Sequence, residues 1–316
     1  MGHVTYVAGD YWPLNTAMYV EDFFGNNPRY VAHLLSLVDF MAFNSGSAQP
    51  SLNRNYIAGI PISLPPPGEQ RAVAEVLGAL DDKIADNELM AETVLELAKC
   101  LYIEASSASI GWRSVRLADT ATWLSGGTPK TNESNFWGGE IPWISAASLK
   151  SPWIYYSDRM VTRLGVNNGT RTVPEGSIIF IVRGMSLISE FRIGLTRREV
   201  AFGQDCKALI PKHGIDPVVL LLAIMASDKE ILGMVDLAGH GTGRLSTDRI
   251  AGLSVRIPDK GAAEYFSRQV ALLVGRASST TLENRALAEL RDTLLPKLVS
   301  GEIRVKDAAR VVGDAV

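Results

Sequence analysis

The stretch Pro65-Pro66-Pro67-Gly68-Glu69-Gln70 opens a long segment, roughly residues 69–104, in which apolar side chains recur at alternating gaps of four and three. The repeating residues are Val73, Leu77, Leu80, Ile84, Asn87, Ala91, Val94, Ala98 and Leu101. A repeat of 3.5 residues is typical of a coiled-coil seam, not merely of one face of a globular helix. At 1.5 Å per residue, the segment predicts a helical rod of about 54 Å. Asn87 is the polar member of the seam, and such a residue usually fixes the register of the pairing.

A second copy of this segment follows when the sequence is shifted by 193 positions. Asn55-Tyr56-Ile57-Ala58-Gly59 then falls on Asp248-Arg249-Ile250-Ala251-Gly252, and Pro65 falls on Pro258. We therefore expect a second long helix over residues 262–300. Its seam positions are Phe266, Val270, Leu273, Ala277, Asn284, Leu287 and Leu294. A repeat of this size predicts two copies of one unit, each a globular piece followed by a long helix. The two helices are expected to pair antiparallel, although two surface helices on separate cores remain an alternative.

The predicted fold class is α+β, with globular domains of mixed sheet and helices separated by two long antiparallel coiled-coil helices. We assign residues 1–68 to an incomplete first domain, 69–105 to the first spacer helix, 106–260 to a complete second domain, 261–301 to the second spacer helix and 302–316 to a C-terminal tail. The first domain is expected to be incomplete because about eighty residues equivalent to 112–190 have no counterpart before Met1.

Local patterns predict several elements within the two copies. The first copy is expected to contain a helix over residues 28–43 and a strand over 60–64, and the second a helix over 217–235 and a strand over 253–257. Residues 177–182, Ser-Ile-Ile-Phe-Ile-Val, predict a further buried strand.

Composition narrows the class of protein. At 316 residues and 47% hydrophobic content, the chain has room for two cores. The longest apolar run, residues 218–226, is too short to span a bilayer, and the N-terminus has no signal pattern. Cys100 and Cys206 lie in different segments, and the four histidines lack metal-ligand spacing. We therefore expect a cytoplasmic protein without a metal site.

The net charge of −3 conceals an uneven distribution. Residues 112–260 carry a balance of +4, and the rest of the chain carries −7. An asymmetry of sign suggests separate partners for separate parts, although +4 over this length is modest.

The ordered set of short motifs resembles the DNA-specificity subunit of Type I restriction–modification systems. In the second copy the motifs are Gly126-Gly127-Thr128-Pro129, Trp137-Gly138-Gly139, Ile141-Pro142-Trp143-Ile144-Ser145, Arg183-Gly184, Gly203-Gln204, and Gly239 ahead of Leu245-Ser246. In the first copy they are Leu14-Asn15-Thr16 and the Pro65–Gln70 stretch, and the chain closes on Leu295-Pro296-Lys297-Leu298-Val299-Ser300-Gly301-Glu302-Ile303.

The resemblance implies a non-catalytic reader of double-stranded DNA. Each target-recognition domain of such a subunit reads one half of an interrupted asymmetric site, and the paired helices act as a ruler. The helices also dock two methyltransferase subunits that carry out adenine-N6 methylation, and a restriction subunit is a further partner. S-adenosylmethionine and ATP belong to those partners, so no cofactor is expected in this chain.

The incomplete first domain departs from the family pattern and leaves several alternatives open. The chain is a truncated or misstarted product, or two copies assemble as a homodimer in which two second domains read DNA, or another chain supplies the missing half. A coiled-coil scaffold that binds the methyltransferase without reading DNA is a further alternative.

Two missing motifs support a non-catalytic role. The sequence contains no Asn/Asp-Pro-Pro-Tyr/Phe stretch, which an amino-methyltransferase would use, and no Gly-x-x-x-x-Gly-Lys-Ser/Thr phosphate loop. Gly239-His240-Gly241-Thr242-Gly243-Arg244 resembles such a loop superficially but lacks its Lys-Ser/Thr ending. We expect no catalytic residues.

Five residues near loops of the second domain are the candidates for DNA binding: Thr128, Lys130, Arg183, Gln204 and Arg244. Arg183 could fork onto guanine O6 and N7, and Gln204 could pair bidentately with adenine. Arg244 could grip a phosphate, and Lys130 a phosphate or a base. The alternative for each is a solvated charge or a hydrogen bond that stabilises a loop. Trp137 and Trp143 are expected to be core anchors, because duplex DNA leaves no base free for stacking unless it is flipped.

Overall fold

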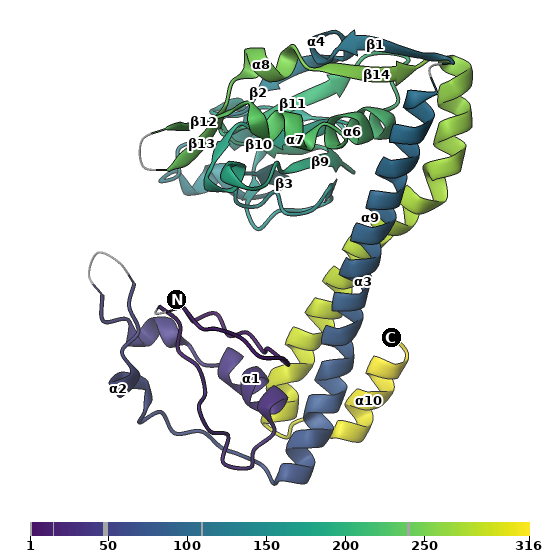
Figure 1. Ribbon diagram of the computed structural model, residues 1–316. Coiled ribbons are helices and arrows are strands. Elements are labelled where there is room, and N and C mark those ends of the chain that lie inside the picture. The colour runs from purple at the N-terminus through teal and green to yellow at the C-terminus, as the bar shows by residue number, and fades with distance from the viewer. Residues whose placement is uncertain (1, 15, 47–49, 109, 239–240) are drawn as a thin grey trace. The chain divides into compact units, whose positions relative to one another are not determined.

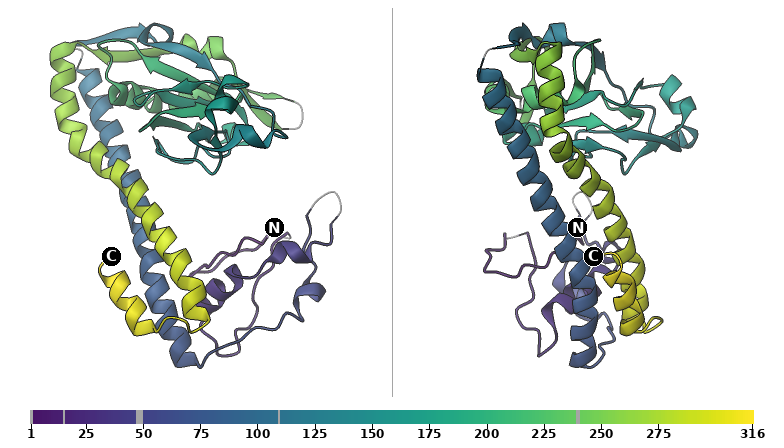
Figure 2. Two further views of the ribbon diagram at one scale, coloured as in Figure 1. Left: turned by 180° about the vertical axis from the view of Figure 1, so that it is seen from behind. Right: turned by 90° about the vertical axis from the view of Figure 1, so that its right-hand side faces the viewer.

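The computed structural model describes residues 2–14, 16–46, 50–108, 110–238 and 241–316. It divides into two compact units, the first made of Met1–Leu89 with Glu283–Val316 and the second of Met90–Leu282. Two long helices, α3 (Pro67–Ser107) and α9 (Lys260–Val299), each contribute one half to either unit. Within each unit, these halves lie side by side and antiparallel (Figure 1, Figure 2). The protein is therefore a mixed helix-and-sheet fold with a paired long helix in both units.

The first unit is helical. Besides its halves of α3 and α9, it contains α1 (Pro28–Ser36), η1 (Phe40–Phe43), α2 (Arg54–Ile57) and α10 (Val305–Gly313). Its core is apolar, and the buried residues are Tyr30, Leu34, Val73, Ala74, Val76, Leu77, Leu80, Leu287, Leu294, Leu295, Leu298, Ala308 and Val312. Residues 302–316, which the sequence suggested as a tail, thus contain a helix that packs into this core through Ala308 and Val312.

The opening stretch of α3 ties the first unit together through a buried amide. Gln70 is 1% exposed, and its Nε2 donates to Asn26 Oδ1 at 2.7 Å and to the Pro65 carbonyl at 2.9 Å. The amide of Asn27 donates to Gln70 Oε1 at 2.9 Å. Asn27 in turn caps α1, because its Oδ1 accepts from the Tyr30 amide. The start of α1 is therefore fixed against the start of α3.

Two local predictions for the first copy are wrong in part. Residues 60–64 form no strand. Their counterpart in the second unit, β14 (Ser254–Pro258), is paired along its length with β1 (Trp112–Arg116), and the described part of the first unit offers no such neighbour. An apolar stretch without a partner cannot form a ladder. The helix expected over 28–43 ends at Ser36 and resumes as the short turn η1.

The second unit holds the sheets. Their strand orders are β1-β14, β5-β3-β10-β6, β2-β11-β7-β9-β4 and β12-β13-β8. The remaining strands are β2 (Ala121–Ser125), β3 (Trp137–Ile144), β4 (Trp153–Ile154), β5 (Met160–Val161), β6 (Thr172–Val173), β7 (Ile178–Ile181), β8 (Arg183–Gly184), β9 (Ile193–Thr196), β10 (Val200–Phe202), β11 (Cys206–Pro211), β12 (Val235–Ala238) and β13 (Thr242–Leu245).

The helices and turns of this unit are mostly short. They are α4 (Leu117–Thr120), η2 (Ser134–Phe136), α5 (Arg163–Asn167), η3 (Met185–Ile188), α6 (Pro217–Met225), α7 (Asp228–Gly233) and α8 (Thr247–Ala251). The single helix expected over 217–235 is therefore broken into α6 and α7, with β12 beginning at Val235.

The core of the second unit lies around β7 and α6. All four residues of β7 are buried, which confirms the strand expected near residues 177–182. α6 is apolar on every side, and most of it is buried in the same cluster. Asp216 caps this helix, because its Oδ1 accepts from the amides of Val218 and Val219 at 2.8 and 3.1 Å.

An aromatic cluster joins the long helices to the sheets of the second unit. Tyr102 of α3, Trp112 of β1 and Phe266 of α9 meet edge to face, with ring centroids 5.5–6.2 Å apart. The Tyr102 hydroxyl donates to the Arg256 carbonyl at 2.8 Å. Because these rings come from three elements, they anchor both helix halves to the two-stranded sheet.

The structure places the expected seam residues inside both cores. In the first unit Val73, Leu77, Leu80, Leu287 and Leu294 are buried and Ile84 is partly buried; in the second, Phe266 and Val270 are buried, whereas Val94, Leu101 and Leu273 are partly buried. Asn87, at 2% exposure, donates through Nδ2 to Asn284 Oδ1 at 2.8 Å. That the seam residues also bind partner subunits stays a prediction. No helix among the described residues is both long and apolar enough to cross a membrane.

Candidate nucleic-acid interface

A hollow of about 600 Å³ opens on the second unit. It is lined by Val182, Arg183, Gln204, Lys207, Asp236, Leu237, Arg244, Leu245, Ser246, Thr247 and Asp248. Three of the five residues proposed from sequence, namely Arg183, Gln204 and Arg244, belong to this lining although they lie in separate segments of the chain. The fold thus brings two guanidinium groups and an amide to one concave surface.

The three-stranded sheet β12-β13-β8 aligns the charged side chains of the hollow. Arg244 of β13 lies opposite Arg183 of β8 on one side and opposite Asp236 of β12 on the other. Residues directly opposite in an antiparallel ladder project on the same face of the sheet. Arg183, Arg244 and Asp236 therefore form one row, with both cations next to each other. Arg183 and Arg244 are exposed, and so is Gln204.

Gln204 is presented by a tight turn, Gly203-Gln204-Asp205-Cys206. The Cys206 amide donates to the Gly203 carbonyl at 3.1 Å, which closes the turn. Gly126 lies directly beneath it, because a Cβ on Gly126 would come within 2.3 Å of the Gly203 carbonyl oxygen. Gly126 therefore provides room for the turn that carries Gln204.

Sequence reasoning missed two residues at this site. Asp205 follows Gln204, and its carboxylate Oδ1 lies 3.8 Å from Arg183 Nη1. Lys207 belongs to the lining, and its Nζ donates to Ser125 Oγ at 2.6 Å on the neighbouring strand. The signal for Lys207 was a single cation inside the otherwise apolar strand β11, because a lysine is rarely buried without a polar partner.

Thr128 and Lys130 do not reach the hollow. Thr128 is half-buried and Lys130 is exposed, on the segment that follows β2. The Lys130 carbonyl accepts from Trp137 Nε1, and the Gly127 carbonyl accepts from Trp143 Nε1, each at 3.1 Å. The two indoles therefore fix the backbone of this segment, and a role of its side chains in DNA binding stays a prediction.

Both tryptophans are placed as structural anchors. Trp143 is 5% exposed, and Trp137 packs edge to face against it at 5.4 Å. The guanidinium of Arg159 lies 3.8 Å from the Trp137 ring centroid and 4.9 Å from that of Trp143. The cation covers one face of the Trp137 ring, and burial closes Trp143 to stacking on a base.

The described part of the glycine-rich segment leads into strand β13. Thr242 to Arg244 belong to β13, so this part of the segment is a paired strand and not a phosphate loop. Gly239 and His240 of the same segment lie outside the described residues, as does Asn15 of the first-copy motif.

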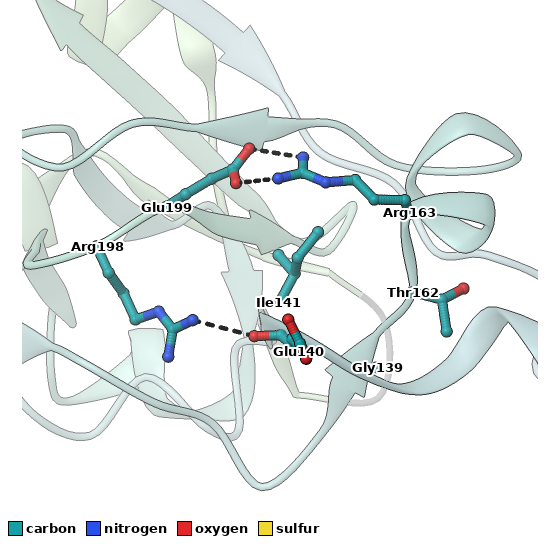
Figure 3. Close-up of a pocket in the computed structure, with 7 residues that line it drawn as sticks. All are labelled: Gly139, Glu140, Ile141, Thr162, Arg163, Arg198 and Glu199. Carbon is teal, nitrogen blue, oxygen red and sulfur yellow. Dashed lines mark hydrogen bonds and ion pairs between the residues drawn. The ribbon is translucent and has the colours of Figure 1, made fainter.

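A second hollow of about 490 Å³ lies beside the β5-β3-β10-β6 sheet (Figure 3). Arg163 donates two hydrogen bonds to the carboxylate of Glu199, and this contact holds the pKa of Glu199 below its ordinary value. Arg198 donates to the Glu140 carbonyl at 3.1 Å. Since both guanidinium groups are already engaged, this hollow is less suited to an anionic ligand than the first. Among the described residues, no cluster of three His, Cys, Asp or Glu could hold a metal ion.

Comparison with known proteins places the chain in a family. A family model described as the Type I restriction modification DNA specificity domain matches residues 1–95 and 109–270. The chain belongs to this family. Every residue that lines the first hollow falls in the second matched segment of the DNA specificity family, and α1 with most of α3 falls in the first.

Members of the DNA specificity family with curated names are similar to the chain over part of their length. The HindI specificity subunit of Haemophilus influenzae is 25% identical over 198 residues, which cover 61% of this chain and 42% of that protein. The EcoR124I/EcoR124II specificity subunit of Escherichia coli is 26% identical over 210 residues, covering 63% of this chain and 52% of that protein. The chain spans about half the length of these relatives.

A solved structure supports the fold. The S subunit of a Type I restriction–modification system from M. genitalium aligns with a TM-score of 0.54 at 17% identity, covering 88% of this chain and 74% of that one. At this identity the likeness bears on the fold alone.

Proposed function

We propose that this chain is a sequence-specific DNA-binding subunit of a Type I restriction–modification complex, and that it reads duplex DNA through the first hollow of its second unit. The main observation behind the proposal is that Arg183, Gln204 and Arg244 all line that hollow. Each was chosen from sequence for a different DNA contact, and they come from three separate segments. Membership of the DNA specificity family also supports the proposal.

The residues divide by chemistry. Arg183 offers a fork for guanine O6 and N7, and Gln204 offers the donor and acceptor that adenine N7 and N6 require. Arg244 and Lys207 add charge that suits phosphate oxygens. Thr128 and Lys130, which lie outside the hollow, would contact the DNA backbone beside it.

The partners follow from the same proposal. Two methyltransferase subunits would dock on α3 and α9 and methylate adenine N6, and restriction subunits would join them. S-adenosylmethionine and ATP would be bound by those subunits, and this chain would be non-catalytic. A second copy or another chain would cover the exposed aromatic side chains of the first unit, among them Trp12 at 91% and Phe24 at 85% exposure.

The test is to map methyladenine in DNA from cells that express this chain with its methyltransferase, against cells that lack this chain. An interrupted motif that depends on the chain is expected. An asymmetric motif would mean that two different half-sites are read, and a palindromic one that two copies of the second unit read DNA. A complex that assembles but methylates no motif would overturn DNA reading and favour the scaffold.

Single-residue variants test whether the hollow binds DNA as proposed. Arg183→Ala should relax discrimination at one base pair by about 1–3 kcal/mol, whereas Arg244→Ala should weaken all sequences similarly. Arg116→Ala is the matched control, because Arg116 is an exposed arginine of the same unit whose guanidinium pairs with Asp119 away from the hollow. If the Arg183→Ala complex methylates the wild-type motif at the wild-type rate, Arg183 does not read a base.

A further inference from the structure

A carboxylate stands beside the guanidinium proposed to read a base. Asp205 Oδ1 lies 3.8 Å from Arg183 Nη1, and both side chains are partly exposed, at 39% and 55%. An ion pair this exposed contributes little to folding stability, typically about 0–1 kcal/mol. Stability therefore gives a weak reason for an acid at a surface that has to approach phosphates.

The backbone of Asp205 fixes the backbone of Arg183. The Asp205 carbonyl accepts from the Val182 amide at 2.8 Å and from the Arg183 amide at 3.3 Å. The Gly203–Cys206 turn and the junction of β7 with β8 are thus tied together at two points. Because the main chain is held there, only the side chain of Arg183 remains to be oriented.

Arg183 and Arg244 differ in this respect. They lie opposite each other in the same ladder, yet none of the described ion pairs involves Arg244. Asp236, its other cross-strand neighbour, is paired instead with Arg249 at 2.9 Å. A guanidinium outside the described ion pairs suits a phosphate anywhere along DNA, whereas a carboxylate 3.8 Å from Arg183 attracts its guanidinium to one side and so favours some of its orientations over others.

We propose that Asp205 is a positioning residue for DNA readout. Its carboxylate orients the Arg183 guanidinium toward one guanine and, by repelling phosphates, weakens binding to DNA that lacks that guanine. The inference rests on the proposed function of the hollow and extends it to a residue that discriminates without touching a base.

The test compares duplexes selected from a random pool by the full chain in complex with its methyltransferase. The variants are Asp205→Asn, Asp205→Glu, Arg183→Ala and the double variant Arg183→Ala/Asp205→Asn, with Arg116→Ala as control. Asp205→Asn keeps the backbone carbonyl and the side-chain size, so the turn should survive. An unchanged tryptophan-fluorescence melting curve would verify this, because five of the six tryptophans lie in the second unit.

We expect Asp205→Asn to lose discrimination at the same base pair as Arg183→Ala, within the roughly 5- to 150-fold that one bidentate contact provides. It should also bind non-cognate duplex several-fold more tightly, Asp205→Glu should restore part of the discrimination, and the double variant should lose no more than Arg183→Ala alone.

Two outcomes would contradict the reasoning in different places. If the wild-type complex selects a motif and Asp205→Asn keeps full discrimination at the Arg183 base pair, or loses it at another position, Asp205 does not position Arg183. If the wild-type complex selects no motif, the proposed function itself fails, and the role of Asp205 fails with it.

Discussion

The two asparagines that pair in the coiled-coil seam, Asn87 and Asn284, are expected to differ in how much stability is lost when each is replaced by alanine. Asn87 is 2% exposed, whereas Asn284 is half-buried. Asn87 Nδ2 donates to Asn284 Oδ1 at 2.8 Å, and Asn284 Nδ2 donates to the Ile84 carbonyl at 3.3 Å. Removing either side chain therefore leaves a different residue without its partner.

The magnitudes follow from what each truncation leaves behind. Asn284→Ala removes two hydrogen bonds and leaves the nearly inaccessible amide of Asn87 without a hydrogen-bond partner. We therefore expect the free energy of unfolding to fall by about 2–3 kcal/mol. Asn87→Ala leaves an amide that water can reach, so about 1 kcal/mol is expected. Replacing both by leucine removes the polar groups together, and this should be neutral or stabilising while relaxing the register.

The assay has to report on the first unit. Tryptophan fluorescence does not serve, because only Trp12 lies there and it is almost fully exposed. Native-state hydrogen exchange of amides in residues 70–89 and 284–298 measures the opening free energy directly. An Asn87→Ala variant that costs as much as Asn284→Ala would refute the reasoning, and so would a double leucine variant less stable than both single variants.

Three further perturbations test other parts of the structure. Gly126→Ala should destabilise the second unit by about 1–3 kcal/mol, read by tryptophan fluorescence, because its Cβ would meet the Gly203 carbonyl; Gly233→Ala, with open space around it, should be silent. Burial raises the pKa of the Cys206 thiol to about 12, so a thiol reagent at pH 8 should modify exposed Cys100 alone until the protein is denatured; equal labelling would contradict this. Burial, with two nearby arginines, lowers the pKa of His33 against the opposing pull of Asp81. The unfolded chain therefore takes up a proton on His33 near pH 6.5, whereas the folded unit does so only at lower pH. The free energy of unfolding should fall as the pH drops below 6.5, and His33→Gln should flatten its dependence on pH between 7.5 and 5.5.

The long helices were predictable because their pattern is local. A 3.5-residue repeat over residues 69–104 anticipates α3 (Pro67–Ser107), and its shifted copy anticipates α9 (Lys260–Val299). Strands depend instead on a neighbour, which is often distant in sequence. Residues 60–64 carry the same apolar signal as β14, yet only β14 has β1 beside it.

The site was partly predictable for a related reason. Residue type and position near loops marked Arg183, Gln204 and Arg244 as candidates for DNA contact, and the structure gathers them in one hollow. The pairing of β8 with β13 joins segments about sixty residues apart, and no local pattern announces it. The approach of Asp205 to Arg183 is likewise set by the fold, and the lone cation Lys207 in strand β11 was a local signal that the sequence analysis did not use.

The seam contains one feature that the internal repeat does not reproduce. The 193-residue shift places Asn87 on Thr280 and Asn284 on Ala91, so the paired amides occur once along the two helices. A slip of either helix by a heptad would place one buried amide against an apolar residue and leave it unsatisfied, at a cost of about 1–3 kcal/mol for each amide. Apolar seam positions tolerate such a slip far better, because one leucine can replace another. The asymmetry therefore selects a single alignment of α3 with α9, which is the property that a pair of helices serving as a ruler on DNA would need.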